Sequence, residues 1–126
     1  MTVICGRLIE SLREEVLEGG ELLSLLNEKE TAILEGKPNA VLAMQEAIIL
    51  QLTTIDYCRR RREERVKDLV PTVGQKCGST LRGLISRCAE MVQPLLNALT
   101  DEVNRLTLTT RRRELQMQML LARHGY

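Results

Sequence analysis

The sequence predicts an all-α protein: an elongated three-helix antiparallel bundle, in which a coiled-coil hairpin is followed by a long C-terminal helix. Three observations predict this class. Apolar residues recur every three to four positions, no segment alternates with period two over a useful length, and prolines occur only at Pro38, Pro71 and Pro94. Phe and Trp are absent, which suits a bundle because Leu, Ile, Val and Ala fill helical seams well. We expect a single helical domain over residues 1–126, with helices at about 3–35, 39–69 and 80–123.

The first helix is predicted by an apolar stripe that a charged residue interrupts once, at Glu30. Gly36 is placed to end this helix, because glycine adopts the left-handed conformation that often follows a helix. Pro38 suits the first turn of the next helix, where its missing N–H is not needed. The stripe comprises Cys5, Leu8, Leu12, Val16, Gly19, Leu23, Leu26, Glu30 and Ile33.

Charges on either side of the break at Gly36–Asn39 are complementary. Residues 1–36 carry eight glutamates and three basic residues, whereas the run Arg59–Arg62 follows at the mirrored distance. Folding the chain back at the break places Glu14 and Glu15 beside Arg59 and Arg60, and Glu10 near Arg65. The pattern therefore predicts an antiparallel hairpin whose register is set by charge. We expect the arginines to form ion pairs with these glutamates and not to bind the phosphates of a nucleic acid or membrane.

The second helix is expected to end before Pro71, and a loop over Val70–Gly78 follows. Ser79 or Thr80 can cap the third helix. Pro94 lies inside this third helix and removes one backbone hydrogen bond, so we expect a kink there. The alternative is two helices broken at Pro94.

The third helix carries apolar residues on two opposite faces beyond Leu106. One face can cover the hairpin, and nothing else in the chain is available to bury the other. An apolar helix face without a cover is typical of a partner-binding surface. We slightly favour a different protein as the partner over a homodimer. The predicted partner-binding residues are Asn104, Leu108, Arg111, Arg112, Leu115, Met119 and Ala122.

Composition and motifs argue against several other classes. The formal net charge is +1, whereas dedicated nucleic-acid-binding domains tend to be strongly basic. The four cysteines form no CxxC pair and lie far from the single histidine, so we expect no metal and no cofactor. No nucleophile elbow or phosphate loop is present, which predicts that the protein is not an enzyme. No secretory signal or membrane-spanning stretch is recognised, and we expect a cytoplasmic protein.

One segment resembles the hairpin of FlgN-type flagellar export chaperones. Residues 21–52, ELLSLLNEKETAILEGKPNAVLAMQEAIILQL, and residues 59–69, RRRREERVKDL, are similar to that family's L-L-x-x-E-x-x-A-L-L segment, its break and its leucine-rich helix with basic residues. Asn104-Arg105-Leu106 matches the second of the family's two asparagine positions, and Asp101 stands where the first would be. Pro38-Asn39 replaces the acidic residue that is common after the break.

The resemblance implies a cytosolic chaperone of flagellar type III export. Proteins of that family bind C-terminal helical segments of the hook-associated proteins at the hook–filament junction, and they deliver these subunits to the export apparatus. Their binding region lies in the C-terminal helix. Two alternatives stay open: a self-associating structural coiled coil, and a nucleic-acid-binding helical protein.

Overall fold

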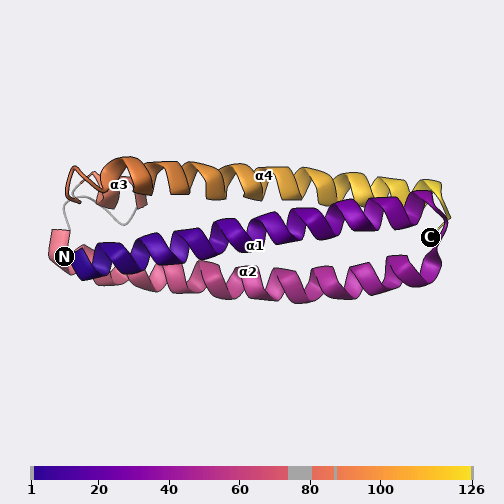
Figure 1. Ribbon diagram of the computed structural model, residues 1–126, viewed down its shortest axis with the longest axis horizontal. Coiled ribbons are helices and arrows are strands. Elements are labelled where there is room, and N and C mark those ends of the chain that lie inside the picture. The colour runs from indigo at the N-terminus through magenta and orange to yellow at the C-terminus, as the bar shows by residue number, and fades with distance from the viewer. Residues whose placement is uncertain (1, 74–80, 87, 126) are drawn as a thin grey trace.

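Within the residues described, the fold consists of four α-helices and contains no strand (Figure 1). The structure is a computed structural model that describes the backbone over residues 2–73, 81–86 and 88–125, and side chains over 5–68, 81–86 and 88–125. The helices are α1 (Thr2–Leu34), α2 (Pro38–Val73), α3 (Leu81–Ile85) and α4 (Gln93–Arg123). The all-α class and the antiparallel hairpin are confirmed.

The break between α1 and α2 forms as the sequence predicts. Gly36 has a φ of 66°, in the left-handed region that favours glycine. Its N–H donates to the carbonyl oxygen of Ile33 at 3.1 Å, and the N–H of Lys37 donates to that of Ala32 at 3.0 Å. These bonds satisfy carbonyl groups at the end of α1, and Pro38 then begins α2.

The prediction that the second helix ends before Pro71 is wrong, because α2 continues to Val73. A proline in the last turn costs the helix only one hydrogen bond, and its fixed φ is compatible with helical backbone. The loop predicted over Val70–Gly78 is correspondingly shorter at its start. The cap predicted at Ser79 or Thr80 lies outside the described residues.

The single third helix predicted over residues 80–123 is also wrong, and the alternative of two helices broken at Pro94 is correct. The short α3 ends at Ile85, and α4 begins at Gln93 with Pro94 in its first turn. Proline starts a helix more readily than it continues one, because it lacks an N–H and its ring clashes with the preceding turn. The side chain of Gln93 stabilises the connection by donating from Nε2 to the carbonyl oxygen of Cys88 at 2.7 Å.

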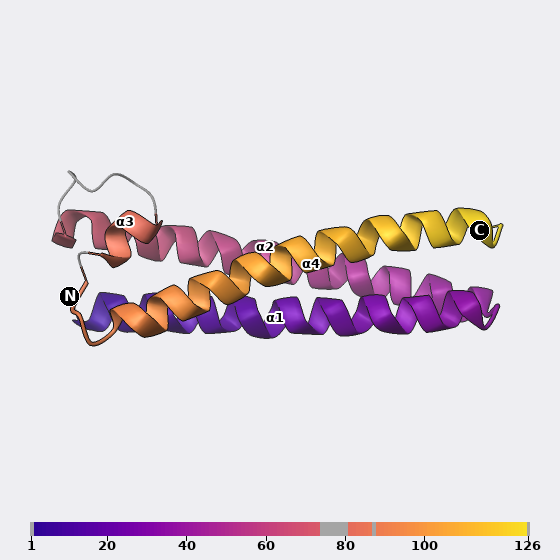
Figure 2. The same ribbon diagram turned by 90° about the horizontal axis from the view of Figure 1, so that it is seen from above.

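The molecule is a rod with α1 at its centre (Figure 1). α2 packs along one side of α1 and α4 packs along another, whereas α2 and α4 share little direct packing. Seen from above, α4 crosses obliquely over the hairpin, and α3 lies beside α2 at the end of the rod that holds the N-terminus (Figure 2). α3 also contacts α4.

Two buried clusters hold the helices together. The first joins α1, α3, the α3–α4 connection and the start of α4 through Cys5, Leu8, Leu12, Leu84, Ile85, Cys88, Leu96 and Val103. The second joins α1, α2 and the C-terminal half of α4 through Leu22, Leu26, Ala32, Ile33, Val41, Ile48 and Met117. Both are built from aliphatic side chains, Cys and Met, as the absence of Phe and Trp requires.

The charge pairing in the hairpin is shifted from the predicted register. Arg61 pairs with Glu14, Nη1 to Oε2 at 3.2 Å, and Arg62 pairs with Glu15, Nε to Oε2 at 3.4 Å. Arg61 and Arg62 follow the buried Cys58 by three and four residues, so their side chains lie towards α1.

The other predicted pairs do not form. Arg59 and Arg60 both pair with Asp56 of their own helix, and Arg65 pairs with Asp68 and not with Glu10. Counting residues outward from the turn ignores the position of each side chain around the helix, and that position decides which arginines reach α1.

Candidate functional site

The apolar residues predicted on the outer face of the C-terminal helix are exposed. Leu108 is 54%, Leu115 61% and Met119 61% accessible to solvent, and Ala122 is also exposed. By contrast, Leu106 and Met117 on the opposite side of α4 are buried against α1. We call Leu108, Leu115, Met119 and Ala122 the α4 stripe.

The polar residues of the predicted site are exposed as well: Asn104, Arg111 and Arg112. Neither Arg111 nor Arg112 forms an ion pair with any residue that the structure describes. Asn104, Arg111 and Leu115 follow one another at spacings of seven and four, so they share one flank of α4. Arg112 lies on the far side of the helix from α1.

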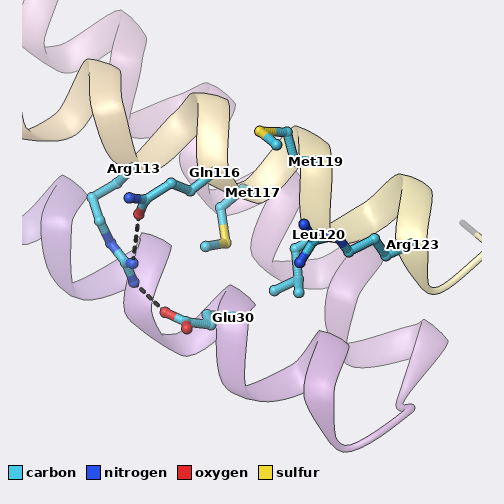
Figure 3. A pocket seen from close by; sticks show the side chains of 7 residues that line it. All are labelled: Glu30, Arg113, Gln116, Met117, Met119, Leu120 and Arg123. Carbon is cyan, nitrogen blue, oxygen red and sulfur yellow. Dashed lines mark hydrogen bonds and ion pairs between the residues drawn. The ribbon is translucent and has the colours of Figure 1, made fainter.

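Arg113, the third arginine of the run, is turned inward. It lies on the side of α4 next to α1, where Nη2 donates to Oδ1 of Asn27 at 2.8 Å and pairs with the carboxylate of Glu30. A hollow of about 240 Å³ adjoins this pair, and Met119 of the α4 stripe lies on its rim (Figure 3). The sequence leaves Arg113 without an acidic neighbour except Glu114, and the structure supplies one from α1.

A groove lies between α2 and α4, with α1 as its floor. It has a volume of about 400 Å³, and an adjoining hollow of about 140 Å³ extends it towards the hairpin turn. Leu52 and Glu114 line both. We call the whole depression the α2–α4 groove. Its floor is lined by Glu15, Gly19 and Leu22 of α1, its α2 wall by Leu52, Ile55, Arg59 and Arg62, and its α4 wall by residues that include Asn104, Leu106, Thr107, Arg111 and Glu114.

Gly19 allows α4 to approach the floor of the groove closely. A Cβ atom at this position would lie 3.2 Å from Cδ1 and 3.3 Å from Cβ of Leu106. Gly19 belongs to the apolar stripe predicted for the first helix, and α4 makes a close contact with α1 there. It seats Leu106 on α1 and so positions Thr107 and Arg111 along the groove wall.

Burial shifts the pKa of two charged groups in the groove. The Glu15 side chain is buried and pairs with Arg62 at 3.4 Å, yet its Oε2 atom accepts no hydrogen bond. Burial raises the pKa of Glu15, and the nearby Arg62 and Arg59 partly oppose this rise. Burial also lowers the pKa of Lys29 in the adjoining hollow, and Glu114 opposes that change. Both buried charges are therefore incompletely compensated within the described residues.

The convergence of two arginine runs on this groove was not predicted. Arg59 and Arg62 reach it from α2, and Arg111 reaches it from α4. Sequence reasoning treated the runs separately, because it assigned the first to the hairpin and placed Arg111 and Arg112 of the second among the partner-binding residues. Only the oblique course of α4 over α1 brings them to one place (Figure 2).

Exposed apolar residues on α2 were also missed. Leu42, Ile49 and Leu50 are all more than half exposed, and Leu52 is 39% exposed. The signal was present in the sequence, since Ile48, Ile49 and Leu50 are consecutive and one helix face cannot bury all three.

The arrangement is suited to binding a polypeptide. Apolar side chains, unpaired cations and an open groove lie side by side on α2 and α4. Among the described residues there is no group of three or more His, Cys, Asp or Glu side chains that could hold a metal ion. In the same residues, no helix is both long enough and apolar enough to cross a membrane.

Comparison with known proteins adds no relative. No protein-family model matches the chain, and neither a curated protein nor a solved structure matches it.

Proposed function

We propose that this protein is a helical chaperone or adaptor that binds a helical segment of a partner protein and performs no catalysis. The observation that carries the proposal is the α4 stripe, whose leucines and methionine are more than half exposed on a helix that is otherwise well packed. Monomeric proteins rarely leave such a row of large apolar side chains without a partner. Helix-to-helix packing is the recognition mode that suits an amphipathic helix.

The more specific proposal is a cytoplasmic chaperone of flagellar type III export. It rests on the resemblance of residues 21–69 to the FlgN-type hairpin and on the asparagine-leucine match at Asn104-Arg105-Leu106. In this role the α4 stripe captures the C-terminal helical segment of a hook-associated flagellar protein. The chaperone shields that segment from aggregation until the export apparatus receives it. Met119 would adapt the stripe to more than one such segment, because methionine is flexible and polarizable.

The test is co-expression with the C-terminal segments of the hook-associated proteins encoded in the same genome. The wild-type protein should form a stable complex with at least one segment, and Leu115→Glu should abolish it. Leu17→Glu is the matched control, because Leu17 is a 71% exposed leucine of α1 outside the stripe. If no segment binds, or if both variants bind as the wild type does, the proposal is wrong.

Point substitution is a better test than truncation. Removing the chain beyond Asn104 would also remove Leu106, which is buried against Gly19 of α1, and Met117, which belongs to the second cluster. Loss of binding would then report unfolding as readily as loss of the site. Sedimentation of the purified protein covers the alternative of a self-associating coiled coil, which predicts a dimer that Leu115→Glu dissociates.

A further inference from the structure

The α2–α4 groove lies between the same two helices as α3, further along the rod. At one end of the rod α3 lies between α2 and the start of α4, and it buries Leu84 and Ile85 in a four-helix arrangement. Beyond α3, within the residues described, no helix lies between α2 and α4, and the groove takes its place. The groove therefore lies where a fourth helix of the bundle would pack.

The base of the groove and part of its α2 wall are apolar. Leu22 and Leu106 are buried at its base, and Ile55 and the 39% exposed Leu52 form the α2 wall. Ile49 precedes Leu52 by three residues, so it extends the same apolar flank of α2 towards the hairpin turn. A helix entering the groove would meet a continuous apolar surface along α2.

Both walls of the groove, on α2 and on α4, also carry arginines. Arg111 on α4 has no ion pair with any described residue, and Arg59 on α2 pairs only with Asp56 and Glu63 of its own helix. Residues 104–123 contain five arginines and the single acid Glu114. An occupant with carboxylates along its flanks would satisfy these cations, whereas one with lysines would be repelled.

The buried Glu15 disfavours a phosphate backbone as the occupant of the groove. Its carboxylate is buried at the base, and Oε2 lacks a hydrogen bond. A phosphate backbone would bring further negative charge towards Glu15 and Glu114, which line the same groove. A protein helix avoids this cost, because its apolar face can cover the base of the groove near Glu15 while its acidic residues stay near the rim.

A second copy of this chain is a poor occupant on grounds of charge. The exposed apolar face of its C-terminal helix is the α4 stripe, which is flanked by Arg111 and Arg112. Docking that face would place arginines of one copy beside Arg59 and Arg111 of the other.

The geometry points to an acidic amphipathic helix of a partner protein as the occupant of the α2–α4 groove, with its apolar face on Leu22, Leu52 and Ile55 and its carboxylates between Arg59 and Arg111. This inference rests on the proposed function and deepens it, because it adds to the α4 stripe a second binding surface for the same partner and gives the helix bound there a charge.

Two synthetic helical peptides test the charge. Each has about 21 residues, which gives a helix about 31 Å long, with leucines along one face. One peptide carries glutamates beside the leucines, and the other carries lysines at the same positions. At low salt the wild-type protein should bind the acidic peptide at least about tenfold more tightly.

Arg111→Glu should remove this preference and improve binding of the lysine peptide. Arg112→Glu is the matched control, because Arg112 is the next residue and is exposed outside the groove. The inference is overturned if the wild type binds neither peptide or binds both equally. It is also overturned if the two arginine variants lose the same affinity, which would indicate general charge attraction.

Leu52→Glu and Leu50→Glu test the groove as the binding surface. Leu50 is 71% exposed and does not line the groove, so only Leu52→Glu should weaken acidic-peptide binding, by about tenfold or more. Circular dichroism should show that both variants keep their helix content. If the protein alone sediments as a dimer that Leu52→Glu dissociates, the groove belongs to a second copy and the inference fails.

The outcomes separate this inference from the proposed function. Should Arg111→Glu and Leu52→Glu bind the hook-associated segments as the wild type does, the groove assignment fails and the proposed function stands. Should the wild type bind the acidic peptide in the groove but no hook-associated segment, the groove stands and the flagellar role fails.

Discussion

Arg113 of α4 and Glu30 of α1 form an ion pair across the helix interface (Figure 3). Asn27 Oδ1 and Gln116 Oε1 accept further hydrogen bonds from the same guanidinium, at 2.8 and 3.0 Å. Glu30 was the one interruption in the predicted stripe of the first helix. The pair therefore fixes the position of α4 along α1, because sliding by one turn would separate the two charges.

Replacing one partner of this pair should destabilise the protein more than replacing both. Arg113→Leu leaves the half-buried Glu30 without its cation, and we expect a loss of about 1–2 kcal/mol in the free energy of unfolding. In Arg113→Leu/Glu30→Leu two apolar side chains can pack instead, so most of that loss should be recovered. Urea unfolding of the two single variants and the double variant measures the coupling. Strictly additive effects would show that the pair does not act as a unit.

Much of the hairpin could be predicted from the sequence because its signals are local. Gly36 and Pro38 mark the turn through backbone conformation alone, and the helix ends at this turn differ by one residue from those expected. The exposure of Leu108, Leu115 and Met119 likewise follows from their angular position on one helix.

What could not be predicted depends on contacts between helices far apart in sequence. Glu30, the partner of Arg113, is 83 residues away in the sequence. Arg59 and Arg111 line the same groove only because of the way α4 crosses α1. Helical periodicity says which side of a helix is apolar, but it does not say against which residues of another helix that side rests. The sequence also left undecided whether Pro94 kinks one helix or separates two, because a proline is compatible with either a kink or a helix start.

Gly19 and Gly20 should respond differently to alanine. A Cβ at Gly20 would meet no atom within 4 Å, so Gly20→Ala should stabilise α1 by about 0.5–1 kcal/mol through helix propensity. A Cβ at Gly19 would press on Leu106 at 3.2 Å, so Gly19→Ala should gain less than Gly20→Ala, and Gly19→Leu should be destabilising by about 1–3 kcal/mol. Thermal and urea unfolding of the three variants check this order. Equal gains for both alanines would contradict the close contact between Gly19 and Leu106.

Glu15 should make the protein less stable as the pH rises through the acidic range. Burial raises the pKa of Glu15 in the folded protein above its ordinary value of 4.5, so ionisation favours the unfolded chain. The free energy of unfolding should therefore fall between about pH 4.5 and the raised pKa, and this contribution should be constant above it. Glu102 acts in the opposite direction, because Arg105 lowers the pKa of that carboxyl.

The difference between the wild type and Glu15→Gln isolates the contribution of Glu15. The wild type should lose stability relative to this variant as the pH is raised from about 4 to 7, and the loss should level off near neutrality. Urea unfolding at several pH values measures it. A difference that stays constant over this range would show that Glu15 titrates normally in the folded state.

Cys88 should resist alkylation in the native protein. Its Sγ atom lies 3.5 Å from that of Cys5 inside the first buried cluster, and burial together with Cys5 raises the pKa of Cys88 to about 12. At pH 8 only about one in ten thousand Cys88 side chains would then be thiolate, the form that reacts with iodoacetamide. Ser86→Cys is a matched control, because Ser86 is exposed only two residues away. Mass spectrometry of the alkylated peptides should find rapid modification at position 86 and slow modification at Cys88, until denaturant makes the rates similar. Rapid native modification of Cys88 would show that the α3–α4 connection does not hold this thiol in the core.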